Sequence, residues 1–275
     1  VSTQEIEVVV PVTEYCEILD EGGKALEDVR LYPFTPSGLC PVSLPGGSIS
    51  ARLVQTESAE LKYLGGNQPA NTIVLTTLDS AATWMELAGV GVMALIVRED
   101  EAMKSLRADP DQPGAWKTLV TGQETIYPRF LVRGPIDKYA DTTVQIRCKV
   151  TWQTKNVRNI IGVMGPDEPR EEALVLTAFY DSNSLVPELA PGAEQAVSLA
   201  TLLEYAGALA PYRDRMVRDI VFVALAGHSQ NLAGSCALLE AIETFSHNRS
   251  DYRPFENRLK DNEQKLAWTG RATEL

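Results

Sequence analysis

The chain has 275 residues, which is enough for one large domain or two ordinary ones around a buried core. Hydrophobic residues make up 44% of it and charged residues 23%, as in an ordinary globular protein, which excludes collagen-like, disulfide-scaffold and disordered chains. No apolar run reaches the roughly 18 residues that span a bilayer, and the net charge of −12 repels a phosphate backbone, so we expect neither a transmembrane segment nor a nucleic acid partner.

The first half of the chain is rich in β-branched runs, which predict strands. Residues 6–12 (IEVVVPV) form the first such run. Farther along, the apolar run 71–77, the helical stretch 80–89 and the apolar run 90–97 follow one another at the spacing of a strand–helix–strand unit. Residues 98–123 are charged and contain prolines, so they predict a long surface loop.

After residue 123, strands and helices alternate more regularly. Residues 142–152 alternate between polar and apolar side chains, as a half-buried strand does, and residues 173–179 (ALVLTAF) have the composition of a buried strand. The other expected strands are 126–132, 157–164 and 218–225, and the expected helices are 193–209 and 233–245. This order predicts an α/β fold with a mainly parallel or mixed sheet flanked by helices.

Three loops follow elements of the second half and are expected at one rim of the sheet. They are Phe179-Tyr180-Asp181, residues 190–194 (APGAE) and residues 226–229 (AGHS). Sites in such sheets lie where the carboxyl ends of the strands meet the loops. These loops therefore hold the candidate functional residues.

The order of these loops resembles peptidase family M28, a family of zinc aminopeptidases and carboxypeptidases. The segment FVALAGHSQNLAGSCALL (residues 222–239) is similar to the strand, paired-glutamate loop and helix start of that family. Asp181, Gly227, Gly234 and Ser235 are the fixed points of the match. The resemblance implies a zinc-exopeptidase-like fold.

The residues that carry the chemistry in active members of the family differ here. The resemblance places Phe179 where a histidine binds zinc, with Asp181 two residues on as its orienting partner. It places Ala193 or Glu194 at the aspartate that bridges two zinc ions, and His228 and Ser229 at the paired glutamates. It therefore implies a degenerate site with no catalytic residue, no cofactor and no metal.

Residues 29–150 resemble a second family, the protease-associated domain, a small β-rich α+β domain. The stretch NTIVLTTLDSAATWMELAGVGVMALIVRED and the later YPRFLV carry this resemblance. We therefore expect an N-terminal strand segment (residues 1–28), a protease-associated-like domain (residues 29–150) and an M28-like domain (residues 151–275).

The order of the two resemblances is that of the group that includes the transferrin receptor, glutamate carboxypeptidase and nicastrin. Members that lost zinc act as recognition or scaffold ectodomains, so the resemblance implies a binding or scaffold module. Its partner would be a protein or a membrane complex, and its location extracytoplasmic or membrane-associated.

Two other interpretations remain open. In the first, Asp181, Glu194 and His228 hold one zinc ion in a divergent metallopeptidase. In the second, the chain is a ligand-binding domain unrelated to proteases. Against a catalytic role, Asp181 is a good cap or turn residue, and His228 has no second histidine near it in the sequence.

The remaining expectations concern the cysteines and the chain ends. Cys16, Cys40, Cys148 and Cys236 form no CxxC motif and are expected as single buried thiols, although three full pairings are open. Val1 suggests a processed or trimmed start, and the M28-like domain looks incomplete at its carboxyl end, where His247 comes too early to be the family's distal ligand. Residues 250–266 have the charge pattern of a solvated helix that is also able to dock on a partner.

Overall fold

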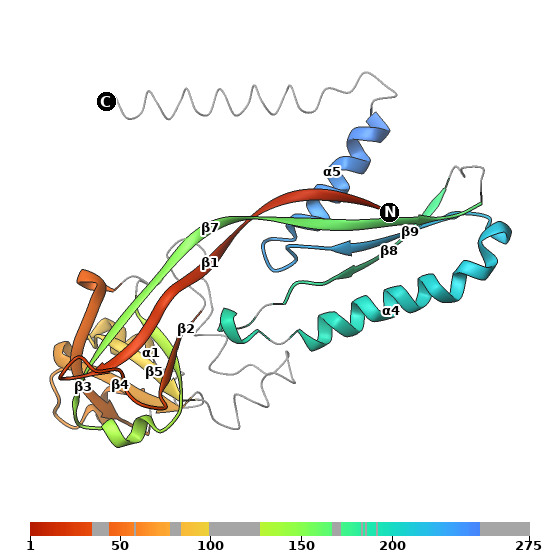
Figure 1. Ribbon diagram of the computed structural model, residues 1–275. Coiled ribbons are helices and arrows are strands. Elements are labelled where there is room, and N and C mark those ends of the chain that lie inside the picture. The colour runs from red at the N-terminus through yellow and green to blue at the C-terminus, as the bar shows by residue number, and fades with distance from the viewer. Residues whose placement is uncertain are drawn as a thin grey trace, which may run out of the picture.

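The structure is a computed structural model that describes residues 1–34, 44–57, 59–77, 84–98, 127–166, 172–182, 184, 186–190 and 192–247. Two long strands run through the whole molecule (Figure 1). They are β1 (Ser2–Asp20) and β7 (Thr143–Met164), which pair antiparallel from Ser2 opposite Ile161 to Asp20 opposite Val144.

In the described part of the chain, nine strands form one mixed sheet in the order β2-β6-β5-β4-β3-β7-β9-β8, and β1 pairs with β7. The other strands are β2 (Arg30–Pro33), β3 (Ser48–Gln55), β4 (Thr72–Thr77), β5 (Ala94–Arg98), β6 (Arg129–Arg133), β8 (Ala173–Phe179) and β9 (Asp219–Leu225). The α-helices are α1 (Trp84–Gly89), α4 (Ala193–Leu209) and α5 (Ala233–His247). Short 3-10 turns lie at η1 (Pro45–Gly47), η2 (Leu61–Leu64), η3 (Pro69–Asn71), η5 (Ile136–Tyr139), η6 (Pro187–Leu189) and η7 (Ala210–Arg215).

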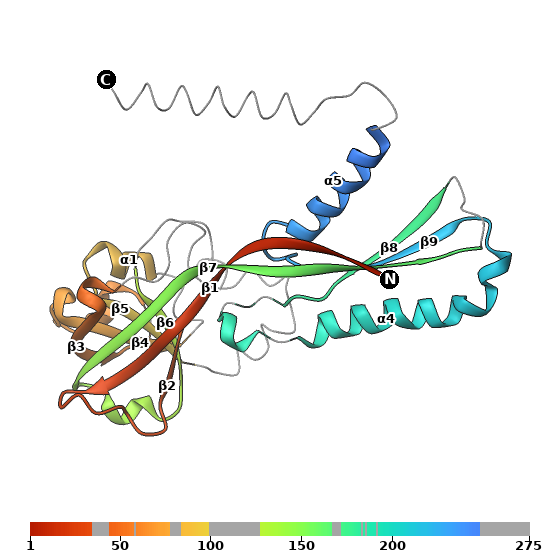
Figure 2. The ribbon, with the colours of Figure 1, turned by 45° about the horizontal axis from the view of Figure 1, so that its top comes forward.

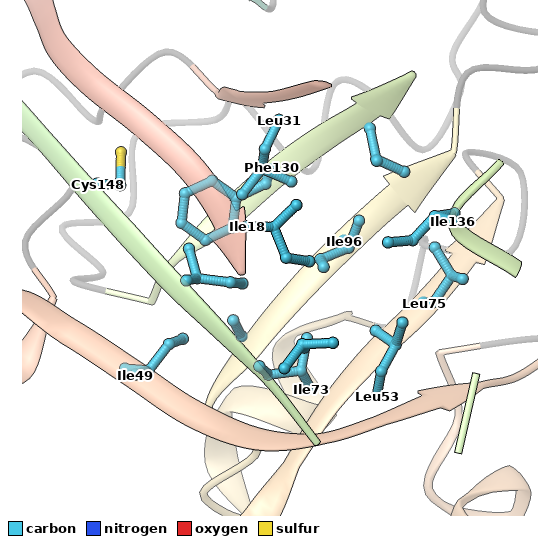
Figure 3. Close-up of a cluster of buried hydrophobic side chains, with 14 of the residues drawn as sticks. Ile18, Leu31, Ile49, Leu53, Ile73, Leu75, Ile96, Phe130, Ile136 and Cys148 are labelled. Carbon is cyan, nitrogen blue, oxygen red and sulfur yellow. The ribbon is translucent and has the colours of Figure 1, made fainter. Parts of the chain in front are cut away.

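The N-terminal part of the sheet contains the main core. Strands β3 to β6 are parallel neighbours, and alternate residues of β4 and β5 enter two hydrophobic clusters, one on each face of the sheet. Ile73 and Ile96 belong to the cluster shown in Figure 3, whereas Val74 and Leu95 pack with Trp84 of α1 on the other face. The predicted strand–helix–strand unit is confirmed as β4, α1 and β5.

The C-terminal part has three layers. Strand β9 is antiparallel to β7 and parallel to β8. Helix α4 covers one face, where Leu202 packs against Ala178 and Phe222. Helix α5 lies on the other side of the sheet, where the Gln4 side chain of β1 donates a 2.8 Å hydrogen bond to the Ala237 carbonyl. Figure 2 shows the two helices on opposite sides of β8 and β9.

The predicted strands and helices among the described residues are confirmed in kind, with one correction, while the loop expected at 98–123 and the helix expected at 250–266 lie outside the described residues. Strand β8 and helix α4 have the predicted bounds, but the two strands expected at 142–152 and 157–164 are one continuous strand, β7. The polar residues between them stay extended because β1 pairs with them, as Thr154 does with Val9. The domain boundary expected after residue 150 falls within β7, and the division into domains stays a prediction.

Among the described residues, no helix is both long enough and apolar enough to cross a bilayer.

Candidate functional site

The carboxyl ends of β8 and β9 lie side by side, as the sequence predicts. Phe179, the last residue of β8, is in register with Leu225, the last residue of β9. The next residue, Tyr180, continues the contact by donating its backbone N–H to the Leu225 carbonyl at 3.1 Å. The loop after β8 and the loop after β9 therefore meet at one rim.

Asp181 fastens the two loops together. Its Oδ1 atom accepts the backbone N–H of His228, and its Oδ2 atom accepts the backbone N–H of Ser229, each at 3.0 Å. A carboxylate that accepts two backbone N–H groups satisfies donors that a turn would otherwise leave unpaired. The sequence interpretation of Asp181 as a cap or turn residue is therefore correct in kind, although the backbone it caps is 47 and 48 residues away.

The side chain of His228 lies flat on Phe179. The two ring centroids are 4.0 Å apart, and the ring planes differ by 7°. Both residues were singled out in the sequence, and the structure brings them together as a stacked pair. Phenylalanine has no atom that could bind a metal, so this contact is a packing contact.

Asn159 of β7 is the residue that sequence reasoning missed. Its side chain is fully buried and makes three hydrogen bonds: Oδ1 accepts the Ala226 N–H at 3.0 Å, and Nδ2 donates to Gln4 Oε1 at 3.0 Å and to the Gly234 carbonyl at 2.8 Å. It connects β7 with β1, with the loop after β9 and with the start of α5. An asparagine directly before two isoleucines in VRNIIGVM was the available signal, because a polar residue inside a buried strand needs partners.

Two glycines let this loop pass close to its neighbours. Gly227 has φ +65°, and a Cβ atom there would lie 3.0 Å from Val8 Cγ1 of β1. At Gly234 a Cβ atom would lie 2.2 Å from the Ala226 carbonyl oxygen, which accepts the Gly234 N–H at 3.0 Å. Both positions were fixed points of the sequence match, and their physical reason is close backbone approach.

The third predicted loop leads into α4. Helix α4 begins at Ala193. Figure 1 shows its start near the end of the sheet at which β8 and β9 finish. Glu194 is thus in the first turn of α4, and its side chain lies outside what the structure describes. Ser235 is the third residue of α5, and His247 is its last.

The described residues do not fit a zinc site. No three histidine, cysteine, aspartate or glutamate side chains among them gather closely enough to hold a metal ion. At the rim, both carboxylate oxygens of Asp181 already accept N–H groups, and the ring of His228 stacks on Phe179. Of the three predicted ligands, the structure describes the side chains of Asp181 and His228 but not that of Glu194.

A separate groove of about 420 Å³ lies away from this rim, beside β1 and η6. Pro11, Cys16 and Leu31 line one side of it, and Pro187 and Glu188 line the other.

Comparison with known proteins gives the following matches. The sequence model of peptidase family M28 matches residues 159–252. No curated protein matches the sequence. Among solved structures, the chain is similar to the aminopeptidase from Aneurinibacillus sp. strain AM-1, with 15% identity, a TM-score of 0.45, and coverage of 85% of this chain and 54% of that one.

It is also similar to the peptidase M28 precursor from Shewanella amazonensis SB2B, with 15% identity, a TM-score of 0.49, and coverage of 88% of this chain and 58% of that one. The chain therefore spans little more than half the length of these two structures. The match to the family model begins at Asn159, the buried connector, and runs through β8, α4, β9 and α5. Residues 159–252 of this chain are therefore similar to peptidase family M28, and this match covers the C-terminal part of the sheet with α4 and α5.

Proposed function

We propose that the M28-like segment, residues 159–252, does not hydrolyse peptides and that the chain is a binding or scaffold module. The observation that carries this proposal is the use of Asp181, whose two carboxylate oxygens hold the backbone of His228 and Ser229. Asp181 holds two loops together at the rim, and the residue that the resemblance places at the zinc-binding histidine, which Asp181 would orient, is Phe179.

The chemistry of hydrolysis supports the same proposal. A zinc peptidase needs three protein ligands, an open position for water and a carboxylate base near that water. Phe179 has no ligand atom, and its ring covers one face of the His228 imidazole. Neither Ser229 nor His228 supplies the carboxylate base.

The second candidate is a divergent metallopeptidase with zinc on Asp181, Glu194 and His228. One observation favours it: Asp181 is already bonded to the backbone of His228, and Glu194 lies in the first turn of a helix that starts on the same side of the sheet.

Metal content separates the two candidates. We would incubate the 275-residue chain with zinc, desalt it and count zinc by mass spectrometry, beside the variants His228→Ala and Asp181→Ala. His247→Ala is the matched control, since His228 and His247 are the two histidines of the chain. The proposal expects far less than one zinc per chain in all four proteins.

About one zinc per chain that disappears in His228→Ala and persists in His247→Ala would overturn the proposal. Hydrolysis of a panel of aminoacyl and peptidyl p-nitroanilides by the zinc-loaded chain would establish the metallopeptidase. Circular dichroism of each variant would verify that it keeps the fold.

The proposal extends to partners and location. It expects no cofactor, a partner that is a protein or a membrane complex, and a place outside the cytoplasm or at a membrane. The support for these points is the resemblance to zinc-free relatives of the family. The protease-associated character of residues 29–150 is part of the same proposal.

A further inference from the structure

We propose that Cys16 of β1 and Cys148 of β7 form a disulfide bond that ties the two long strands together. The sequence analysis expected single buried thiols, and the structure corrects it for Cys236, which is exposed. Cys148 is buried and Cys16 is partly buried, and the two are direct partners in the strand pairing. Cys40 lies outside the described residues.

The geometry already meets the requirements of a disulfide. Residues directly opposite each other in an antiparallel pair have Cα atoms about 4.5–5.5 Å apart, and disulfides span about 4.4–6.8 Å between Cα atoms. Opposed residues also point to the same face of the sheet. Here that face is the core, because Cys16 packs against the cluster that contains Cys148. The strand pairing therefore places the two cysteines within reach of a disulfide.

The position of the pair gives the bond a structural role. Strand β3 pairs with β7 only as far as Arg147, and β9 pairs with it only from Ile160 onward. Among the described residues, β1 is therefore the only strand that pairs with residues 148–159 of β7. Cys16 and Cys148 are the first pair of this two-stranded ribbon.

A register irregularity lies next to the pair. The pairing of β1 with β7 shifts between Thr13 and Tyr15, where β1 has one extra residue. Slippage of a strand by one residue would move its side chains to the opposite face. A covalent bond at Cys16 fixes the register on the core side of the irregularity.

The surroundings of Cys16 determine when the bond forms. The hydrogen bond to Cys148 and burial raise the pKa of the Cys16 thiol, and the nearby carboxylate of Glu188 adds to the effect. A thiol kept protonated reacts slowly. The groove beside Cys16 admits a small oxidant, but we expect rapid oxidation only during folding, before the strands are buried.

The oxidant belongs to the class of disulfides, of which oxidised glutathione is a small example. The Cys16 thiolate attacks one glutathione sulfur, the S–S bond of glutathione breaks, and one glutathione leaves as a thiolate that takes up a proton. The Cys148 thiolate then attacks Cys16 Sγ in the mixed disulfide and releases the second glutathione. Two cysteine thiols lose two electrons and two protons, and oxidised glutathione gains them.

Mapping the bond tests the proposal. The reduced, unfolded 275-residue chain is refolded in a glutathione redox buffer, its free thiols are blocked with N-ethylmaleimide, and it is digested with trypsin without reduction. The expected product joins the peptide of residues 1–24 to the peptide that contains Cys148, while Cys236 is found blocked. The joined peptide disappears in Cys16→Ser and persists in the matched control Cys236→Ser.

The double variant Cys40→Ser/Cys236→Ser retains only the proposed pair and keeps the test valid if Cys16→Ser does not fold. Reduction should lower its melting temperature by roughly 10 °C, since the bond closes a loop of more than a hundred residues. Full blocking of both Cys16 and Cys148 after oxidative refolding would overturn the proposal. So would a bond from either of them to Cys40 or Cys236.

Discussion

Two polar side chains, the partly buried Asp181 and the fully buried Asn159, hold the rim of the C-terminal part together in different ways. Asp181 accepts two backbone N–H groups of the loop after β9. Asn159 accepts one N–H group of that loop and donates two hydrogen bonds, one to Gln4 of β1 and one to Gly234 of α5. Each side chain replaces backbone partners that an irregular loop lacks.

Replacing Asp181 should destabilise the protein. Asp181→Ala leaves the N–H groups of His228 and Ser229 without their acceptor, and we expect a loss of about 2 kcal/mol in the free energy of unfolding. Urea denaturation measures it. The control is Glu172→Gln, whose ion pair with Arg218 is well exposed and worth little. Equal stability of Asp181→Ala and the wild type would show that water replaces the carboxylate.

Asn159 is expected to be the more costly residue to change. Asn159→Ala removes three hydrogen bonds from a fully buried position, for which we expect a loss of about 3 kcal/mol. Gln4→Ala removes one of the three together with the bond of Gln4 to the Ala237 carbonyl, and it should cost about 1–2 kcal/mol. The two free energies of unfolding are compared in urea. If Gln4→Ala costs as much as Asn159→Ala, the contacts to Ala226 and Gly234 contribute little.

At the scale of elements, the two α-helices of the C-terminal part begin for different reasons. Helix α4 has the predicted bounds because Pro191 and Gly192 precede it and because residues such as Leu199, Leu202 and Ala206 repeat at the helical period. Helix α5 begins where Gly234 lies against the Ala226 carbonyl. The sequence predicted both starts, but the physical reason for the start of α5 is a contact with another element.

Two glycine-to-alanine changes measure that difference. Gly234→Ala pushes a methyl group into the Ala226 carbonyl oxygen and Asn159 Oδ1, 2.2 and 2.6 Å away, so we expect a loss of at least about 3 kcal/mol. Gly207→Ala, inside α4 with nothing within 4 Å, should instead stabilise the protein by about 0.5–1 kcal/mol through helix propensity. The melting temperatures of both variants show whether each change stabilises or destabilises the protein. A stable Gly234→Ala variant would mean that the start of α5 can move.

Strand β8 is an exposed edge in the described part of the chain. Its sequence ALVLTAF contains no charge and no proline, and Leu174 and Val175 are 51% and 42% exposed. Such an edge pairs readily with strands of other molecules. We expect Val175→Lys to reduce heat-induced aggregation, measured by light scattering. The control is Val217→Lys, which adds the same charge at an exposed position outside the strands and should reduce aggregation less. If both variants reduce aggregation equally, the cause is net charge and not the strand edge.

The sequence predicted most elements because burial leaves a pattern in it. Strand β7 was divided in two because Gln153, Thr154 and Lys155 have no apolar period, since the ribbon there has no core on either face. The site was predicted in part. The meeting of the β8 and β9 loops follows from parallel strands, but the stacking of Phe179 on His228 and the connections of Asn159 depend on side-chain contacts across the fold.

At the scale of the whole molecule, the core is unevenly distributed. Ile73, Leu95 and Phe130 in the N-terminal part of the sheet have no exposed surface. The buried members of the C-terminal cluster are Ala178, Leu202 and Phe222, and each keeps 8–9% exposure. Burial of apolar surface is the main source of stability, so the two parts are expected to differ in resistance to opening.

Hydrogen exchange measures that difference. We expect the amides of β4 and β5 to exchange most slowly and those of β8 and α4 to exchange much faster, with β7 changing from slow to fast along its length. Mass spectrometry of peptides after timed labelling follows each element. Uniform protection from β4 to β8 would instead show that the molecule opens as one cooperative unit.

The unbroken course of β7 also restricts how the length of the molecule can change. Successive side chains of a strand point to opposite faces, so removing one residue from each strand of the ribbon between Cys148 and Asn159 would turn the faces of the C-terminal part over relative to those of the N-terminal part. Removing two from each would restore the faces and bring the two parts closer by about 7 Å. The spacing between the two parts can therefore change only in steps of two residues, taken from both strands at once.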